Sequence, residues 1–304
     1  MRILDIKLTY NCNNHCCLCC QNDRIKNCSS DISLDSIYAF IDSFPKDDTI
    51  STKIVLTGGE PTLHPQILEI IRYIRDSGYK NIQLQSNLTL QNSNIVLNDL
   101  LKSGITNFGI SLHGHNAEIH EKFTCTKGSF ECTVRNLKLL SSLRIPVSLN
   151  CVLSRYNISY LFDIVEFVQS NSLADSIQFA FIHIMGRAEL RHNLIPRISE
   201  AATEVHKAIR LIGNSKITVK TEAIPFCLMR GFEKHVAELE KLDDIVVLDK
   251  TGVLSFSEHR MECLKSKTAR CKQCLFFSMC EGPWREYPSI FGWDEFEPVR
   301  SVKG

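Results

Sequence analysis

The 304-residue sequence predicts an α/β fold: a partial, TIM-like (β/α)6 barrel of parallel strands, followed by a small second domain. Two observations support this prediction. Short β-branched apolar runs alternate six times with amphipathic helical patterns over the first 213 residues, and the alternation stops after Ile212. Parallel strands need helical crossovers, and a closed barrel of eight units typically needs about 250 residues, so six units predict an open barrel.

Each element follows from its local pattern of apolar residues. Alternating or consecutive β-branched residues predict strands, and apolar residues three and four apart predict helices. The predicted strands are 3–9, 52–56, 81–85, 108–112, 147–153 and 176–183. The predicted helices are 34–44, 65–77, 95–103, 129–143, 160–170 and 199–212.

The last third of the chain has a different pattern. Residues 245–257 carry Lys250, Thr251 and Gly252 at their middle and predict a β-hairpin, which a Cys-rich and aromatic tail follows. We therefore place a boundary near Gly213 and predict two domains, residues 1–213 and 214–304.

The composition excludes several classes of protein. The 35 basic and 34 acidic residues nearly cancel, which argues against a nucleic-acid-binding protein. No apolar run approaches the roughly 20 residues of a membrane span, and no signal peptide precedes the first strand, so we expect a cytoplasmic protein without a membrane anchor. Fourteen cysteines in such a chain favour metal binding over a disulfide framework.

The first cysteine group follows the first predicted strand directly. Cys12, Cys16 and Cys19 have the spacing C-x3-C-x2-C. Three thiolates on one loop can hold three irons of a cubane cluster and leave the fourth iron without a protein ligand. A zinc loop or buried thiols remain the alternatives on spacing alone.

A second motif, Leu-Thr-Gly-Gly-Glu-Pro, ends the second predicted strand and contains Gly58, Gly59 and Glu60. Glycines allow a backbone to approach a ligand closely, and the glutamate adds a carboxylate beside it. Together the cysteine triplet and this motif resemble the radical S-adenosylmethionine (SAM) superfamily, over most of residues 1–213.

The resemblance implies the chemistry of the first site. Cys12, Cys16 and Cys19 match the ligands of a 4Fe-4S cluster whose open iron binds the amino and carboxylate groups of SAM. With an electron from a donor such as flavodoxin or ferredoxin, SAM cleavage would yield methionine and a 5′-deoxyadenosyl radical. That radical would abstract a hydrogen atom from a substrate.

The resemblance also implies residues that bind SAM. Gly58, Gly59 and Glu60 match the segment that accepts hydrogen bonds from the SAM ammonium group. Ser111 and Arg187 match positions that contact SAM. From the residues alone, two other interpretations are as good as contact with SAM: Ser111 caps a turn, and Arg187 is a solvated charge.

The second cysteine group is Cys271, Cys274 and Cys280, spaced C-x2-C-x5-C. A zinc ribbon is the alternative interpretation. After a radical SAM domain, this spacing resembles the SPASM and twitch extensions, which bind auxiliary 4Fe-4S clusters. Full SPASM domains have a cysteine where Trp284 stands and another where Ser257 stands, so the resemblance implies one auxiliary cluster.

The fourth ligand of that cluster has two candidates. Cys227 precedes the predicted hairpin, where such domains often place a ligand, and we favour it over Cys263. Alternatively, Cys227 is a catalytic residue that donates a hydrogen atom to a substrate radical, as a peptide epimerase would need.

SPASM and twitch enzymes mostly modify peptides, so the resemblance implies maturation of a ribosomally made peptide. The first strand begins at Ile3 and leaves no room for a leader-binding domain, so we expect direct binding or a separate leader-recognition protein. Dehydrogenation or rearrangement of a small-molecule precursor is the alternative, as is a non-catalytic role in cofactor maturation.

Overall fold

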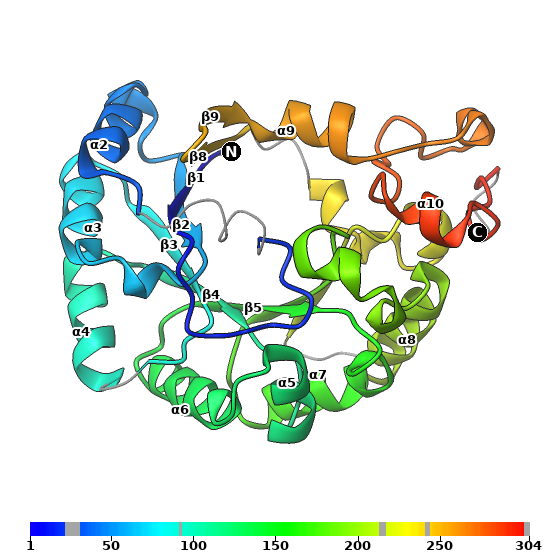
Figure 1. The fold of residues 1–304 in the computed structure, drawn as a ribbon, viewed down its shortest axis with the longest axis horizontal. Helices are drawn as coiled ribbons and strands as arrows, with labels where there is room; N and C mark the ends of the chain where they lie inside the picture. Colours follow the sequence, from blue (N-terminus) through cyan, green and yellow to red (C-terminus); the bar gives the residue numbers. More distant parts are fainter. Residues whose placement is uncertain (22–30, 91–92, 213–216, 241–243, 301–304) are drawn as a thin grey trace.

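A curved nine-stranded sheet organises the molecule, with strand order β7-β6-β5-β4-β3-β2-β1-β8-β9. The computed structural model describes residues 1–21, 31–90, 93–212, 217–240 and 244–300. Neighbouring strands run parallel, except in the antiparallel hairpin of β8 and β9. Figure 1 shows the helices on the outside of the curved sheet. The predicted α/β partial barrel is therefore confirmed.

All six predicted strands and six predicted helices are present, with ends shifted by a few residues. The strands are β1 (Arg2–Thr9), β2 (Lys53–Gly58), β3 (Asn81–Ser86), β4 (Asn107–Ser111), β5 (Val147–Val152), β6 (Ser176–Ala180), β7 (Thr218–Glu222), β8 (Asp244–Asp249) and β9 (Gly252–Ser255). The helices are α2 (Leu34–Asp42), α3 (Ile67–Asp76), α4 (Ser93–Ser103), α5 (Ala117–Thr124), α6 (Ser129–Ser142), α7 (Leu161–Ser170), α8 (Ile198–Ile212), α9 (Phe256–His259) and α10 (Tyr287–Phe291).

The core lies between the outer face of the sheet and the helices. In α3 the buried residues Ile67, Ile70, Ile71 and Ile74 recur at helical spacing and form one apolar face. In β5 buried and half-buried residues alternate strictly, so Leu149 packs in the core while its neighbours face the inside of the barrel. β4 alternates in the same way, and polar side chains from several strands lie on the inner face.

The part of the chain beyond residue 213 extends this sheet at both ends. β7 pairs with β6, and β8 of the predicted hairpin pairs in parallel with β1. The sequence did not indicate β7 or the joining of β8 to β1. The division into residues 1–213 and 214–304 stays a prediction, and residue 213 itself lies outside the described residues.

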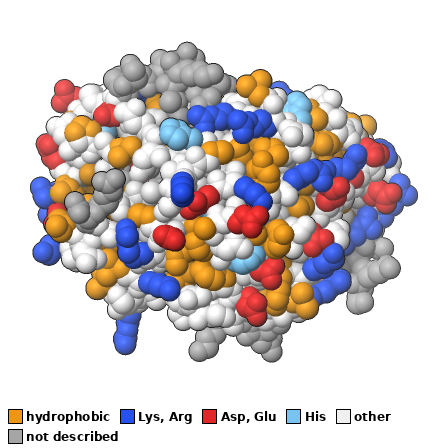
Figure 2. Space-filling view, turned by 60° about the horizontal axis from the view of Figure 1, so that its bottom comes forward, with side chains coloured by type: hydrophobic (Ala, Val, Ile, Leu, Met, Phe, Trp, Pro, Cys, Tyr) orange, Lys and Arg blue, Asp and Glu red, His pale blue; other side chains and the backbone are white. Residues whose placement is uncertain are grey.

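The surface of the molecule is mixed in character. On the face shown in Figure 2, basic and acidic side chains are interspersed with apolar ones, as the net charge of +1 leads one to expect. Within the part of the chain that the structure describes, no helix is both long enough and apolar enough to cross a membrane.

Candidate active site

The loop after β1 carries the first cysteine group at the carboxyl ends of the parallel strands. Cys12, Cys16 and Cys19 are all half-buried. Burial, with the nearby charges of Glu60 and Cys19, raises the pKa of Cys12 to about 11. Burial and the charges of Cys19 and Cys12 likewise raise the pKa of Cys16. The three thiols therefore lie close enough together that ionising one opposes ionising the next, and bound iron would relieve that repulsion.

Helix α5 holds one side of this loop. The amide of Cys17 donates to the carbonyl of Phe123 at 2.8 Å, and the amide of His15 donates to that of Thr124 at 3.0 Å. This helix is absent from the elements predicted from the sequence. A signal for it exists in Asn116, whose Oδ1 caps the helix by accepting from the Ile119 amide at 3.0 Å.

The segment after β6 holds the other side of the loop. Arg187 donates from its backbone amide to the Cys19 carbonyl and from its guanidinium to the Cys16 carbonyl, both at 3.0 Å. A Cβ atom on Gly186 would lie 2.7 Å from the Cys19 carbonyl oxygen, so only glycine allows this approach. Arg187 thus braces the cysteine loop, and it also lines the cavity described below.

The neighbouring backbone requires two glycines at the carboxyl end of β2, the last residue of the strand and the residue after it. A Cβ atom on Gly58 would lie 2.1 Å from the Thr9 carbonyl oxygen, and one on Gly59 would lie 2.3 Å from that of Asn11. The Gly59 amide donates to Thr9 at 2.7 Å. Both glycines therefore let the segment after β2 pair with the start of the cysteine loop, while they also line the cavity.

Glu60 is fully buried and is not among the residues that line the cavity. Its Oε1 accepts from the Ser86 hydroxyl at 2.8 Å and from the backbone and hydroxyl of Thr62 at 3.2 and 2.7 Å. Its Oε2 accepts from the Asn87 amide at 2.8 Å. Burial raises the pKa of Glu60, and these hydrogen bonds oppose that rise. In this arrangement its carboxylate joins the ends of β2 and β3.

Asn87 links that carboxylate to the first cysteine. Its side-chain nitrogen lies 3.6 Å from Cys12 Sγ and 2.7 Å from Asn13 Oδ1. The orientation of Cys12 therefore depends on the buried contacts of Glu60, which follows the neighbouring strand.

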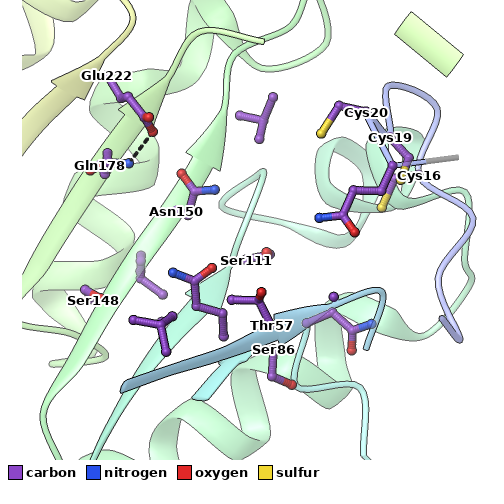
Figure 3. A pocket seen from close by; sticks show the side chains of 18 of the residues that line it. Cys16, Cys19, Cys20, Thr57, Ser86, Ser111, Ser148, Asn150, Gln178 and Glu222 are labelled. Carbon is purple, nitrogen blue, oxygen red and sulfur yellow. Dashed lines mark hydrogen bonds between the residues drawn. The ribbon is translucent and has the colours of Figure 1, made fainter. Parts of the chain in front are cut away.

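A cavity of about 670 Å³ opens beneath the cysteine loop and continues into the barrel. Such a volume is typical of sites for small molecules and cofactors. Figure 3 shows Cys16 and Cys19 on one side of it, with Asn150, Gln178 and Glu222 on the opposite side. Seven of the site residues predicted from the sequence line this cavity: Cys12, Cys16, Cys19, Gly58, Gly59, Ser111 and Arg187.

The residues around this cavity fit a cluster better than a single ion. Within the described residues, no three His, Cys, Asp or Glu side chains are arranged to hold one metal ion. A cubane distributes its thiolate ligands over different irons, so its ligands need not converge on one point. Three neighbouring thiols facing a cavity of this volume suit a cluster with an open iron and a ligand beside it.

The second cysteine group gathers around a smaller cavity. Cys227, Cys271, Cys274 and Cys280 all line it. Burial and the charges of the other three cysteines raise the pKa of Cys227 to about 12. Cys263 is exposed and lines neither cavity.

Backbone amides are directed at two of these sulfur atoms. The Val299 amide donates to Cys274 Sγ and the Gly282 amide to Cys280 Sγ, both at 3.4 Å. Amide donors of this kind stabilise negative charge on sulfur and are one of the features that tune iron–sulfur clusters.

Comparison with known proteins agrees with this geometry. Residues 6–168 match the family model described as the radical SAM superfamily. An AdoMet-dependent heme synthase of Methanosarcina barkeri is 26% identical over 99% of this chain and 84% of its own length. A probable GTP 3′,8-cyclase of Saccharolobus islandicus is 29% identical over 62% of this chain, which spans only 59% of that relative.

Among solved structures, Streptococcus suis SuiB bound to SAM has the same fold. The TM-score is 0.68 at 13% identity, over 99% of this chain and 77% of SuiB. Because the family model covers more than half of the sequence, the chain belongs to the radical SAM superfamily, whose enzymes use a 4Fe-4S cluster and SAM.

Proposed function

We propose that this radical SAM enzyme abstracts a hydrogen atom from a ribosomally made peptide. The observation that carries the proposal is the position of three neighbouring thiols, Cys12, Cys16 and Cys19, over a cavity that continues into the barrel and has polar side chains among those of its wall. With cluster and SAM bound, one electron and one substrate C–H bond would give methionine, 5′-deoxyadenosine and a substrate radical.

The residues of this chain hold and orient the reactants. Cys12, Cys16 and Cys19 ligate the cluster in this proposal, and the backbone of Gly58 and Gly59 accepts hydrogen bonds from the SAM ammonium group. Ser111 and Arg187 contact SAM from the ends of other strands. The role proposed for Glu60 is different, because its carboxylate is occupied by Ser86, Thr62 and Asn87. Glu60 positions the SAM-binding segment.

A second, auxiliary 4Fe-4S cluster is proposed at Cys227, Cys271, Cys274 and Cys280. All four are half-buried and line one cavity, which supports this set over one that contains the exposed Cys263. A Cys227 that donates hydrogen to the substrate would need to face the larger cavity, and Cys227 does not line it. We therefore assign Cys227 as a ligand.

Two comparisons bear on the substrate. SuiB, which shares this fold, has been solved with its precursor peptide SuiA. The heme synthase of M. barkeri favours the alternative of a small-molecule precursor, because the match covers 84% of that relative. We favour a peptide, bound directly or presented by a separate recognition protein, with flavodoxin or ferredoxin as the electron donor.

The test is a reconstitution experiment without oxygen. Protein loaded with iron and sulfide is reduced with dithionite, given SAM, and assayed for 5′-deoxyadenosine; a candidate peptide is then assayed for a change in mass. We expect 5′-deoxyadenosine from the wild type and none from a variant with Cys12, Cys16 and Cys19 all changed to Ala. An inactive wild type with a full iron content would contradict the proposed reaction.

A further inference from the structure

We propose that the barrel interior recognises an uncharged peptide segment through amide hydrogen bonds, and that Gln178 and Asn150 determine this specificity. The inference rests on the proposed peptide substrate and names the part of the peptide that binds. Its basis is the set of carboxamide side chains on the inner wall of the larger cavity, which are Gln83, Gln85, Asn150 and Gln178.

These four side chains come from β3, β5 and β6, and they occupy positions where a barrel usually has apolar side chains. The interior of an α/β barrel is usually packed with branched aliphatic residues, so four carboxamides there call for a polar occupant. Gly109 on β4 makes room for them, because a Cβ atom there would lie 3.1 Å from Cγ of Gln85. Figure 3 shows Asn150 and Gln178 on the inner face of adjacent strands, opposite the cysteine loop.

The amide of Gln178 is held in one orientation. Its Nε2 donates to Glu222 Oε2 at 2.8 Å, and Glu222 Oε1 accepts from the Arg260 guanidinium at 2.8 Å. The ion pair with Arg260 favours an ionised Glu222, and a carboxylate only accepts hydrogen bonds. The nitrogen of Gln178 must therefore face Glu222, which leaves its Oε1 as an acceptor for a ligand.

Asn150 provides a second acceptor on the neighbouring strand. Its Oδ1 is buried and, among the described residues, has no hydrogen-bond partner. A buried polar atom without a partner is costly, and a turn of the Asn150 amide towards the cavity that it lines would let a ligand N–H satisfy it. Two carbonyl acceptors on adjacent strands fit the N–H groups that a peptide backbone presents at regular intervals.

The cations of the cavity wall are engaged within the protein, so an anionic occupant would have to compete with existing contacts. A triphosphate or a polycarboxylate needs cations that are free to pair with it. Two lining cations pair with carboxylates, Lys7 with Asp5 at 2.7 Å and Arg260 with Glu222 at 2.8 Å. Two others donate to backbone carbonyls, Arg187 to Cys16 at 3.0 Å and Lys220 to Lys234 at 3.1 Å. Lys53 is also engaged. A neutral amide ligand requires none of these pairs to break.

The experiment uses the full-length reconstituted protein with SAM and a displayed library of random short peptides. We expect the recovered peptides to share an uncharged run. The best binder is then synthesised as a series in which each backbone N–H in turn is methylated. Affinities are measured for the wild type, for Gln178→Leu, and for Gln169→Leu, which makes the same change at an exposed position on α7.

At one position in the peptide, methylation should weaken binding to the wild type and to Gln169→Leu by about 10-fold. The same methylation should change binding to Gln178→Leu little, because the acceptor is already gone. Thermal unfolding of each variant shows that the fold is intact, and Asn150→Leu repeats the comparison if Gln178→Leu unfolds.

The possible outcomes separate the two proposals. This inference would be overturned if methylation had equal effects in the wild type, Gln178→Leu and Gln169→Leu, or if anionic peptides were recovered. Either result would leave the proposed peptide substrate intact. Recovery of no peptide at all would overturn both this inference and the proposed peptide substrate.

Discussion

The guanidinium of Arg260 lies 2.8 Å from the carboxylate of Glu222, across the gap between the two edges of the open sheet. Glu222 ends β7, and Arg260 follows β9 by a few residues. Arg260 also pairs with Glu281 at 2.8 Å and with Glu238 at 3.4 Å, and its side chain is 8% exposed. A buried ion network thus bridges the opening that a closed barrel would fill with further strands, and it connects the segment after Cys280 to the cavity wall.

Arg260→Met should destabilise the protein by about 3–5 kcal/mol, because it leaves buried carboxylates without their counter-ion. Denaturant unfolding of the cluster-free protein measures this. The control is Lys207→Met, which removes an exposed pair with Glu204 on α8 and should cost less than about 0.5 kcal/mol. Equal effects of the two substitutions would show that the network contributes no more than a surface pair.

Changing Cys12, Cys16 and Cys19 to Ala should halve the iron content. We expect about eight irons per chain in the wild type, from two cubane clusters, and about four in the variant. Cys132→Ala, outside both cysteine groups, should leave the iron content unchanged. A wild type that binds only four irons, or only zinc, would contradict the two-cluster proposal.

Cys227→Ala and Cys263→Ala should behave differently. The loss of Cys227 should lower the iron content or alter the spectrum of the auxiliary cluster, since a thiolate ligand leaves the iron. The exposed Cys263 should be replaceable without either change. If instead Cys227→Ala keeps a normal cluster and still cleaves SAM, and a substrate radical then accumulates, Cys227 is the hydrogen donor.

Glu60→Gln should reduce stability more than SAM affinity. The amide group cannot accept all the hydrogen bonds that reach the carboxylate from Thr62, Ser86 and Asn87, so about 1–3 kcal/mol of unfolding free energy should be lost. The affinity for SAM, measured by calorimetry, should fall less than about 10-fold. Glu189→Gln, at an exposed position, is the control. A far larger loss of affinity at unchanged stability would restore the direct contact with SAM that the sequence suggested.

His120 should make the protein less stable in mild acid. It is buried, and its burial lowers its pKa from 6.5 to about 4. The unfolded chain therefore takes up a proton that the folded protein resists, and stability present above pH 6.5 is lost as the pH falls towards 4. The loss attributable to His120 is about 3 kcal/mol. The pH dependence of unfolding should become shallower over this range in His120→Gln, with a remainder from His113, whose pKa burial also lowers. The dependence should not change in His192→Gln, which alters an exposed histidine.

Local patterns were sufficient for most of the elements and failed where the pattern was short. The α3 region predicts its helix because four isoleucines recur at helical spacing. β7 has Val219 as its single apolar residue and α5 has only eight residues, so neither shows enough apolar periods to stand out from its surroundings. The roles inferred for Glu60 and Arg187 rest on a family resemblance, which carries no information about what each side chain contacts in this chain.

The strand–helix order, the hairpin, the superfamily and the two groups of cysteines could be predicted, because each is a pattern of neighbouring residues. The pairing of β8 with β1, the position of Cys227 beside Cys271, Cys274 and Cys280, and the absence of Glu60 from the cavity wall became evident in the folded molecule. The same holds for the amides and partnered charges inside the barrel. These contacts join residues far apart in the chain. They depend on which edge of the sheet is open and on which side chains can be buried together. A local sequence pattern contains neither piece of information.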